Sequence, residues 1–287
     1  MNSHALNEAI TVNSQFSRNL RRLSTFASLA FVLCPPAALA ITWGGGSGDY
    51  GTGTNWVGGV APAGTDEATI SSGLATLNAN LSRAATTTVN GTGQLVVNGR
   101  FLNAQNGPAV FNVADNGVMT QTGNYFIVST SNVDGTLNQT GGTVNVTVDR
   151  GFFMTDGGAP NPGNGTINAL GGVFNASFTT TDVNNNLHNF QAGRRGATDT
   201  FYVNGGDVNF MTSQTNRRMY FSQNSKLQVD NGSFDSNGFE YFVVGYGTSL
   251  NGGNLSGTSR MVVNGGVSTI NLTPTGSFVV SDGQSGV

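Results

Sequence analysis

The amino-acid sequence predicts an all-β protein whose main part is a right-handed parallel β-helix (β-solenoid) of about seven irregular coils. Three observations predict this fold class: a glycine-rich composition, a short block that recurs with a glycine turn at its centre, and an aromatic strand between most blocks. The 287-residue chain contains 42 Gly and only 9% charged residues. Gly, Asn, Thr and Ser form helices poorly, whereas Val, Phe, Ile and Thr suit strands.

The first forty residues have the pattern of a cleaved export signal. Basic residues from Arg18 to Arg22 precede an apolar run from Leu23 to Cys34, and Ala38-Leu39-Ala40 has the small-x-small pattern of a cleavage site. The apolar run is too short to span a bilayer as a helix. We therefore expect cleavage near Ile41, no membrane span in the mature part, and an extracellular or cell-surface location that includes the outer membrane.

The exported part has few chemically active side chains. It contains nine Lys and Arg residues against fourteen Asp and Glu residues. The basic residues form no stripe, which argues against nucleic acid as a partner. Cys34, the one cysteine, leaves with the signal, so thiol and disulfide chemistry are excluded. His188 is the one histidine after the signal, which excludes a multi-histidine metal site. We expect no cofactor and no metal.

Seven twelve-residue blocks align without gaps in the rest of the chain. They begin at Gly93, Gly117, Gly135, Gly165, Asp199, Ser225 and Ser259. Their third position is always apolar: Leu95, Met119, Leu137, Ile167, Phe201, Leu227 and Met261. Such self-similarity is typical of a repeat architecture, and unequal spacing between blocks is typical of loop insertions on one side of a solenoid.

Each block has the pattern of a short strand, a tight turn and a second short strand. The seventh position is glycine in all blocks but one, and we expect a structural turn at Gly99, Gly123, Gly141, Gly171, Gly205 and Gly265. Such a turn also suits a β-hairpin. The solenoid is favoured because strands this short bury no core alone, whereas recurring chemistry lets like residues stack on like.

A further strand with an aromatic residue precedes most blocks. These strands centre on Phe153, Phe190, Phe221, Phe242 and Phe278. One coil is thus expected to hold an aromatic strand, a loop and a block. The loops 156–165, 182–196 and 245–257 differ most between coils and are expected to present contact surface.

The sequence divides into three segments. Residues 1–40 are the cleaved signal, 41–92 an N-terminal capping segment with the first coils, and 93–287 the solenoid repeats. The aromatic strand at Phe278 is followed by no further block. We therefore expect the natural protein to continue beyond Val287, and we expect an open solenoid end to be a site of self-association.

The opening of the mature part resembles a known family. Trp43, Asn55-Trp56, Gly58-Gly59, Pro62 and Asp66 are similar to the start of bacterial exported proteins with autotransporter-associated β-strand repeats. The blocks resemble the repeats of those proteins and of surface proteins with a PEP-CTERM sorting signal. The resemblance implies a passenger-like, surface-associated β-helix that acts in adhesion or display. The chain shows neither a translocator barrel nor a Pro-Glu-Pro sorting segment, which leaves the secretion route open, and a short secreted protein remains an alternative.

The leading hypothesis is a structural or adhesive protein without enzyme activity, whose loops contact surfaces or polysaccharide. Candidate ligand contacts are Trp43, Trp56, Arg194, Arg195, Arg217 and Arg218, because indoles stack on sugars and paired arginines bind acidic groups. The alternative is a polysaccharide-binding or polysaccharide-degrading β-helix, in which Asp199, Asp207 and Asp235 meet on one face. A third possibility is a spacer between other modules.

Overall fold

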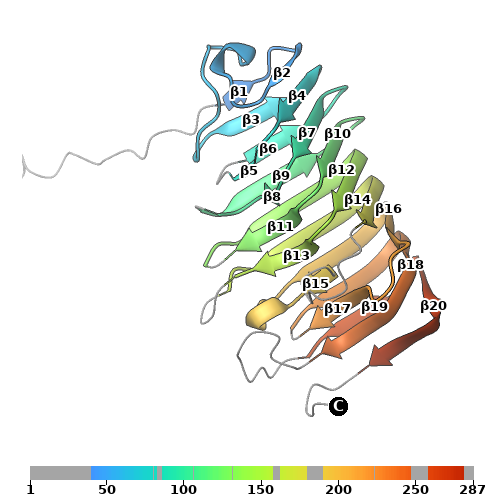
Figure 1. Cartoon of the computed structure of the whole chain (residues 1–287). Coiled ribbons are helices and arrows are strands. Elements are labelled where there is room, and N and C mark those ends of the chain that lie inside the picture. The colour runs from blue at the N-terminus through green and yellow to red at the C-terminus, as the bar shows by residue number, and fades with distance from the viewer. Residues whose placement is uncertain are drawn as a thin grey trace, which may run out of the picture. The chain divides into compact units, whose positions relative to one another are not determined.

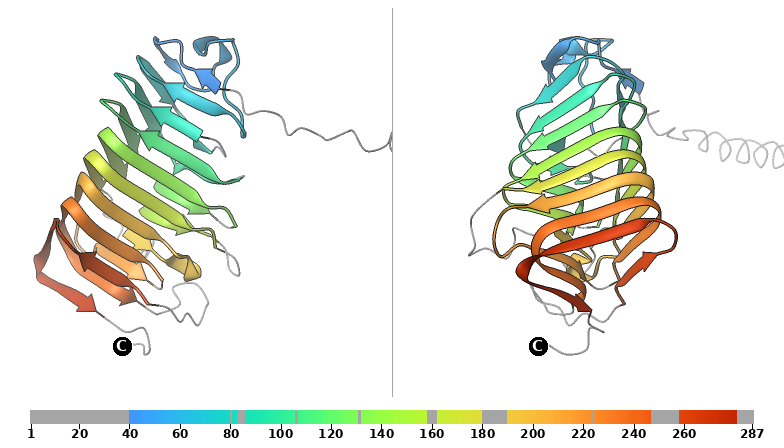
Figure 2. Two further views of the ribbon diagram at one scale, coloured as in Figure 1. Left: turned by 180° about the vertical axis from the view of Figure 1, so that it is seen from behind. Right: turned by 90° about the vertical axis from the view of Figure 1, so that its right-hand side faces the viewer.

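The computed structural model describes residues 40–79, 81–82, 86–105, 107–130, 132–157, 162–179, 190–222, 224–246 and 258–280. In this part of the chain all ladders between the named strands are parallel, and successive coils stack in chain order (Figures 1 and 2). The predicted parallel β-helix is confirmed. The predicted signal segment lies outside the described residues except for Ala40, which begins the first strand.

The coils have three faces, each a ladder of parallel strands. The first face contains β1 (Ala40–Thr42), β3 (Glu67–Ile70), β6 (Thr86–Val89), β9 (Ala109–Val113), the first parts of β12 (Gly135–Val148), β14 (Gly165–Phe178), β16 (Thr200–Thr212) and β18 (Lys226–Tyr246), and β19 (Arg260–Val263). The second face contains β2 (Ser47–Asp49), β4 (Leu74–Leu77), β7 (Gln94–Asn98), β10 (Val118–Thr122), the later parts of β12, β14, β16 and β18, and the start of β20 (Val267–Val280).

The third face is built from the predicted aromatic strands. It contains β5 (Leu81–Ser82), β8 (Phe101–Leu102), β11 (Tyr125–Thr130), β13 (Gly151–Asp156), β15 (Phe190–Ala192), β17 (Arg218–Ser222) and the ends of β18 and β20. The seven blocks lie in seven successive coils. Segment 41–92 supplies two further rungs before them.

The core runs along the axis between the faces as ladders of like side chains. On the third face Phe101 stacks on Phe126 with ring centroids 4.5 Å apart and planes 7° apart, and Phe126 lies 4.6 Å from Phe152. All three rings are fully buried. Buried and exposed residues alternate along the first and second faces, as a strand with one buried side requires. The third-face strands are instead buried on both sides, where Leu102, Ile127 and Phe153 form a second apolar cluster.

The first two blocks are one strand out of phase with the other five. Leu95 pairs with Met119, and Met119 pairs with Val144 on the second face. The third residue of the third block, Leu137, instead lies on the first face and pairs with Phe111. The gapless alignment therefore placed the first two blocks wrongly, because a glycine turn followed by apolar residues occurs at two different corners of the coil.

The glycine turns also differ in detail from the sequence prediction. In the third and fourth blocks the left-handed backbone is at Gly142 (φ 63°) and Gly172 (φ 73°), one residue after the predicted Gly141 and Gly171. The first glycine of each pair is required by close approach, because a Cβ on Gly141 would lie 2.7 Å from the carbonyl oxygen of Asp115. The remaining predicted turns lie at Gly99, Gly123 and Gly205, which have positive φ, and at Gly265.

Asparagine ladders connect the coils on the outside. On the first face the Asn138 amide donates to Asn112 (3.0 Å), and the Asn168 amide donates to Asn138 (2.9 Å). A second ladder on the second face joins Asn145, Asn175 and Asn209 at 3.0 and 3.1 Å. Each amide N–H thus donates to the equivalent residue of the preceding rung, as expected for stacked Asn side chains.

The N-terminal end of the stack is covered. The Val57 amide donates to the Thr42 carbonyl, and the Gly44 amide donates to the Asn55 carbonyl, both at 2.8 Å. These bonds form an antiparallel bridge between Trp43, which follows β1 directly, and Trp56. Beneath them Trp56 packs edge-on against the ring of Tyr50 with centroids 5.0 Å apart, which closes this end of the core.

Candidate functional site

The two tryptophans predicted as sugar platforms are part of this cover. Trp43 and Trp56 are 4% and 3% exposed and pack edge-to-face on each other with centroids 5.0 Å apart. Their indole N–H groups donate to the carbonyls of Gly46 (2.9 Å) and Tyr50 (2.8 Å). Neither indole face is open to a sugar, and the arrangement serves packing.

The longest connections of the repeat region border the third face. Segments 157–164 and 247–259 leave the end of a third-face strand, and segment 179–189 enters one. The corner between the first and second faces is instead a tight turn inside one continuous strand in β12, β14, β16 and β18. Residues 158–161, 180–189 and 247–257, including His188 and most of the predicted contact loops, lie outside the described residues.

Most arginines after residue 40 also lie at the third face or its edges. They are Arg100, Arg150, Arg194, Arg195, Arg217 and Arg218, six of the nine Lys and Arg residues after that position. The two arginine pairs named by the sequence analysis are therefore both on this face. The side chain of Arg195 is outside the described set.

Tyr125 is at the centre of a cation–aromatic cluster on the outside of this face. Its ring stacks on Phe153 of the next coil with centroids 5.5 Å apart and planes 29° apart. The guanidinium of Arg100 in the preceding coil lies 5.5 Å from the Tyr125 centroid, and that of Arg150 in the following coil lies 5.7 Å from it. Arg150 is exposed and Tyr125 is half-buried. Three successive coils thus hold two guanidinium groups against one ring.

Arg194 is held from two sides at the far end of the same face. It follows Gly193, whose φ of 75° begins the short 3₁₀ turn Arg194–Gly196. Its guanidinium forms an ion pair with Asp156 and lies 4.7 Å from the Phe153 centroid. Its side chain is 10% exposed, so this arginine orders the coil rather than offering a free cation.

The second arginine pair divides between the inside and the outside of the coil. Arg217 is buried, with 2% exposure. Arg218 is half-buried, donates from Nη1 to the Tyr220 hydroxyl (3.0 Å), and lies 4.9 Å from the Tyr241 centroid. Arg218 thus packs its guanidinium on a tyrosine ring, as Arg100 and Arg150 do at Tyr125, but in coils nearer the C-terminal end of the face.

Asp199, one of the three candidate carboxylates, is a buried junction between coils. Its Oδ1 accepts hydrogen bonds from the Thr155 hydroxyl (2.6 Å) and the Gly165 amide (2.7 Å), and its Oδ2 accepts one from the Gly193 amide (2.7 Å). Burial outweighs these bonds and raises the pKa of Asp199 from 3.8 to about 6. The carboxylate is fully buried, so it is not placed to attack a polysaccharide.

The other two candidate carboxylates share the outer side of the second face. Asp207 pairs in register with Ser233 and accepts a hydrogen bond from its hydroxyl (3.0 Å), while Asp235 pairs with Asn209. Asp199 lies ahead of β16 at the corner between the third and first faces. The three acids therefore do not meet on one face as the enzyme hypothesis requires.

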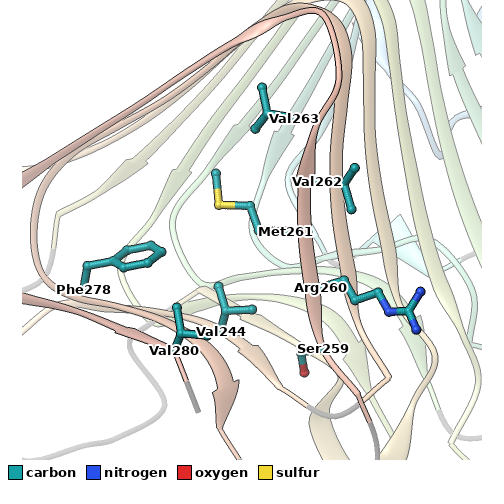
Figure 3. A pocket seen from close by; sticks show the side chains of 8 residues that line it. All are labelled: Val244, Ser259, Arg260, Met261, Val262, Val263, Phe278 and Val280. Carbon is teal, nitrogen blue, oxygen red and sulfur yellow. The ribbon is translucent and has the colours of Figure 1, made fainter. Parts of the chain in front are cut away.

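A hollow opens at the C-terminal end of the stack (Figure 3). Its volume is about 530 Å³, and it is lined by Val244, Ser259, Arg260, Met261, Val262, Val263, Phe278 and Val280. Met261 and Phe278 face each other across it, whereas the Arg260 guanidinium extends away from them (Figure 3). The hollow is the continuation of the core axis at the last rung.

Sequence reasoning missed Arg100, Tyr125 and Arg150. The available signal was an arginine or tyrosine immediately before an inward aromatic strand, at Arg100-Phe101 and Tyr125-Phe126. This signal could be interpreted only with the strand register that places Tyr125 between Arg100 and Arg150. The first two blocks were misaligned, so the sequence analysis did not find that register.

Within the described ranges no three His, Cys, Asp or Glu side chains are grouped so as to hold a metal ion. The same ranges contain no helix of the length and hydrophobicity needed to cross a membrane. Comparison with protein-family models, with curated proteins and with solved structures finds no match.

Proposed function

We propose that this chain is an exported, cell-surface β-helix that adheres to acidic polysaccharide through the outside of its third face. The observation that supports the proposal is that Arg100, Arg150 and Arg218 each lie against a tyrosine ring on the outside of this face. The resemblance to exported proteins with autotransporter-associated repeats supports the surface location.

The chemistry of the cluster fits a carboxylated or sulfated glycan. A guanidinium stacked on an aromatic ring keeps its N–H groups in the plane, where they can bind a carboxylate or sulfate in two-point fashion. Arg150 and Arg218 lie on tyrosine rings in different coils and have the exposure that such contact needs. A long anionic chain lying along the stack would reach both.

Binding to immobilised alginate, pectate and heparin tests the proposal. We expect retention that falls steeply between about 50 and 300 mM salt, because the contacts are between exposed charges. Arg150→Ala should weaken binding several-fold. Arg260→Ala is the matched control, since it removes an exposed arginine from the first face. Equal loss in both variants, or equal retention on neutral cellulose, would show that the third face is not the contact surface.

The same incubations test the alternative of a polysaccharide-degrading β-helix. Asp207 and Asp235 share one outer face, which is the observation that favours this alternative. We expect no new reducing ends or unsaturated products, with or without Ca²⁺. Product formation that disappears in Asp207→Asn would replace the adhesive proposal with an enzymatic one.

A further inference from the structure

We propose that the chain carries a modification site at Asn231-Gly232, where attack by the main chain converts the asparagine to isoaspartate and aspartate. The dipeptide lies inside β18, at the corner between the first and second faces. The inference is therefore independent of the polysaccharide proposal, which concerns the third face. It rests on a contact between Gly232 and the Asn231 side chain, and on the close fit of this corner to the preceding coil.

The backbone nitrogen of Gly232 lies against the carboxamide that it would attack. Its N–H donates to Oδ1 of Asn231 at 3.0 Å. A nucleophile held beside its target reacts much faster than one that must first be brought there. Asn231 is exposed, so water and hydroxide reach the carboxamide. Gly232 has no side chain to obstruct closure of a five-membered ring, and the corner thus holds the two reacting groups together.

The reaction needs water as its one co-reactant. The Gly232 nitrogen loses its proton and forms a bond to Cγ of Asn231, while the bond from Cγ to Nδ2 breaks and ammonia leaves. The product is a succinimide ring. Water then adds to one of the two ring carbonyl carbons and opens the ring. Addition at Cγ gives aspartate, and addition at the backbone carbonyl carbon gives isoaspartate, in which the main chain runs through Cβ and Cγ.

The other Asn–Gly pairs in the described ranges lack this contact, because none of their asparagines accepts a hydrogen bond from the glycine that follows. Three of these side chains instead bond to the neighbouring coil, those of Asn98, Asn237 and Asn264. At Asn164 the N–H of the following glycine is held by the buried carboxylate of Asp199. The reactive arrangement is therefore specific to Asn231 and is not a property of the dipeptide alone.

Asn124 provides a comparison within the same chain. Its Oδ1 accepts a hydrogen bond from the Tyr125 N–H, also at 3.0 Å. Here the following residue has a large side chain, whose ring stacks on Phe153. Ring closure would require this packed tyrosine to move, so Asn124 should react much more slowly than Asn231 although the hydrogen bond is the same.

The corner at Gly232 has no room for a longer main chain. A Cβ added to Gly232 would lie 2.3 Å from the carbonyl oxygen of Gly206 in the preceding coil. The register between β16 and β18 shifts on both sides of Asn204, which pairs with Asn231. Isoaspartate adds one atom to the main chain here, so it should loosen the ladder between β16 and β18. Aspartate keeps the main-chain length and should leave the ladder in place.

Peptide mapping by mass spectrometry tests the inference on the purified full chain kept for several weeks in mildly alkaline buffer. We expect isoaspartate and aspartate to accumulate at Asn231 at least about tenfold faster than at Asn98, Asn124, Asn237 or Asn264. In the chain unfolded by urea the Asn–Gly pairs should react at similar rates, because the contact between Gly232 and Asn231 is lost.

Amide hydrogen exchange measures the consequence for the coil. Exchange in β16 and β18 should quicken as isoaspartate accumulates. Asn231→Ser removes the reaction and should keep this exchange constant over the same incubation. Asn98→Ser is the matched control, and its exchange should quicken as in the parent.

Several results would overturn the inference. They are no change at Asn231, the same order of rates in the folded and the unfolded chain, and aspartate without isoaspartate, which would indicate direct hydrolysis of the side chain. Exchange that quickens equally in Asn231→Ser would show that the ladder loosens for another reason.

Discussion

Asp199 shows how one residue can join neighbouring coils and also make their stability depend on pH. Its carboxylate accepts bonds from Thr155 in β13, from Gly165 at the start of β14 and from Gly193 after β15. The sequence shows an acid at the start of a block, which suggests turn chemistry. Its burial could not be predicted, because it results from the loop that returns Gly193 to the corner.

The raised pKa of Asp199 predicts stability that falls as pH rises. The folded state holds the proton up to about pH 6, whereas the unfolded chain releases it near 3.8. The folded state therefore binds more protons between these values, and the free energy of unfolding should decrease by about 2 kcal/mol from pH 4 to pH 6 and level off above about pH 7. Urea unfolding at half-unit pH steps measures this, with Asp199→Asn as the reference that lacks the titration.

The variant Thr155→Val provides an independent test of the pH dependence, because it should shift the pKa of Asp199. Removing the hydroxyl withdraws a hydrogen bond that favours the ionised carboxylate, so the pKa of Asp199 should rise further and the upper end of the sloping window should move above pH 6. A slope that is the same in the parent and in Asp199→Asn, or a window that moves downward in Thr155→Val, would contradict this account.

At the scale of single strands, the sequence predicted the fold well and the phase poorly. Glycine at a turn and an apolar residue two positions into a strand are local properties, and both are visible without the structure. Which corner a turn occupies depends on the stacking partner. Met119 pairs with Val144 rather than with Leu137. A gapless alignment of the blocks cannot show which residue stacks on which.

The candidate site was only partly predicted, because the sequence does not show which side chains of neighbouring coils lie together. The two arginine pairs border β15 and β17, which are neighbouring strands of the third face. The burial of Arg217 and the role of Tyr125 depend on side-chain contacts between coils, and these contacts have no local sequence signal.

Gly142 should be among the positions in a coil where a side chain is least tolerated. Its φ is 63°, and a Cβ there would lie 2.1 Å from the Gly117 carbonyl oxygen of the preceding coil. Gly142→Ala should therefore lower the free energy of unfolding by at least about 2 kcal/mol. Gly64→Ala is the matched control, because no heavy atom lies within 4 Å of a Cβ added at Gly64. Chemical denaturation compares the two, and equal effects would contradict the turn geometry.

At the scale of the whole molecule, neighbouring coils interact through backbone ladders, asparagine ladders and stacked rings, and a few rings also reach the second coil along, as Phe152 does to Phe210 at 5.6 Å. Stability of such an array is close to a sum over adjacent pairs. Loss of one contact should loosen the coils beside it, and the covered N-terminal end should exchange its amide hydrogens more slowly than the last rung.

The ladders also have a mechanical consequence. Their hydrogen bonds run along the axis of the stack, so tension applied between the two ends loads one rung at a time instead of shearing many bonds together. Successive coils from β9 onward repeat every 26 to 34 residues in register. Unfolding of each coil should lengthen the chain by roughly 80–120 Å. Force spectroscopy should show a staircase of small steps, with the largest resistance at the coils that Asp199 joins, and a single large rupture would exclude this behaviour. A protein anchored at one end would then extend under flow and rewind when the load falls.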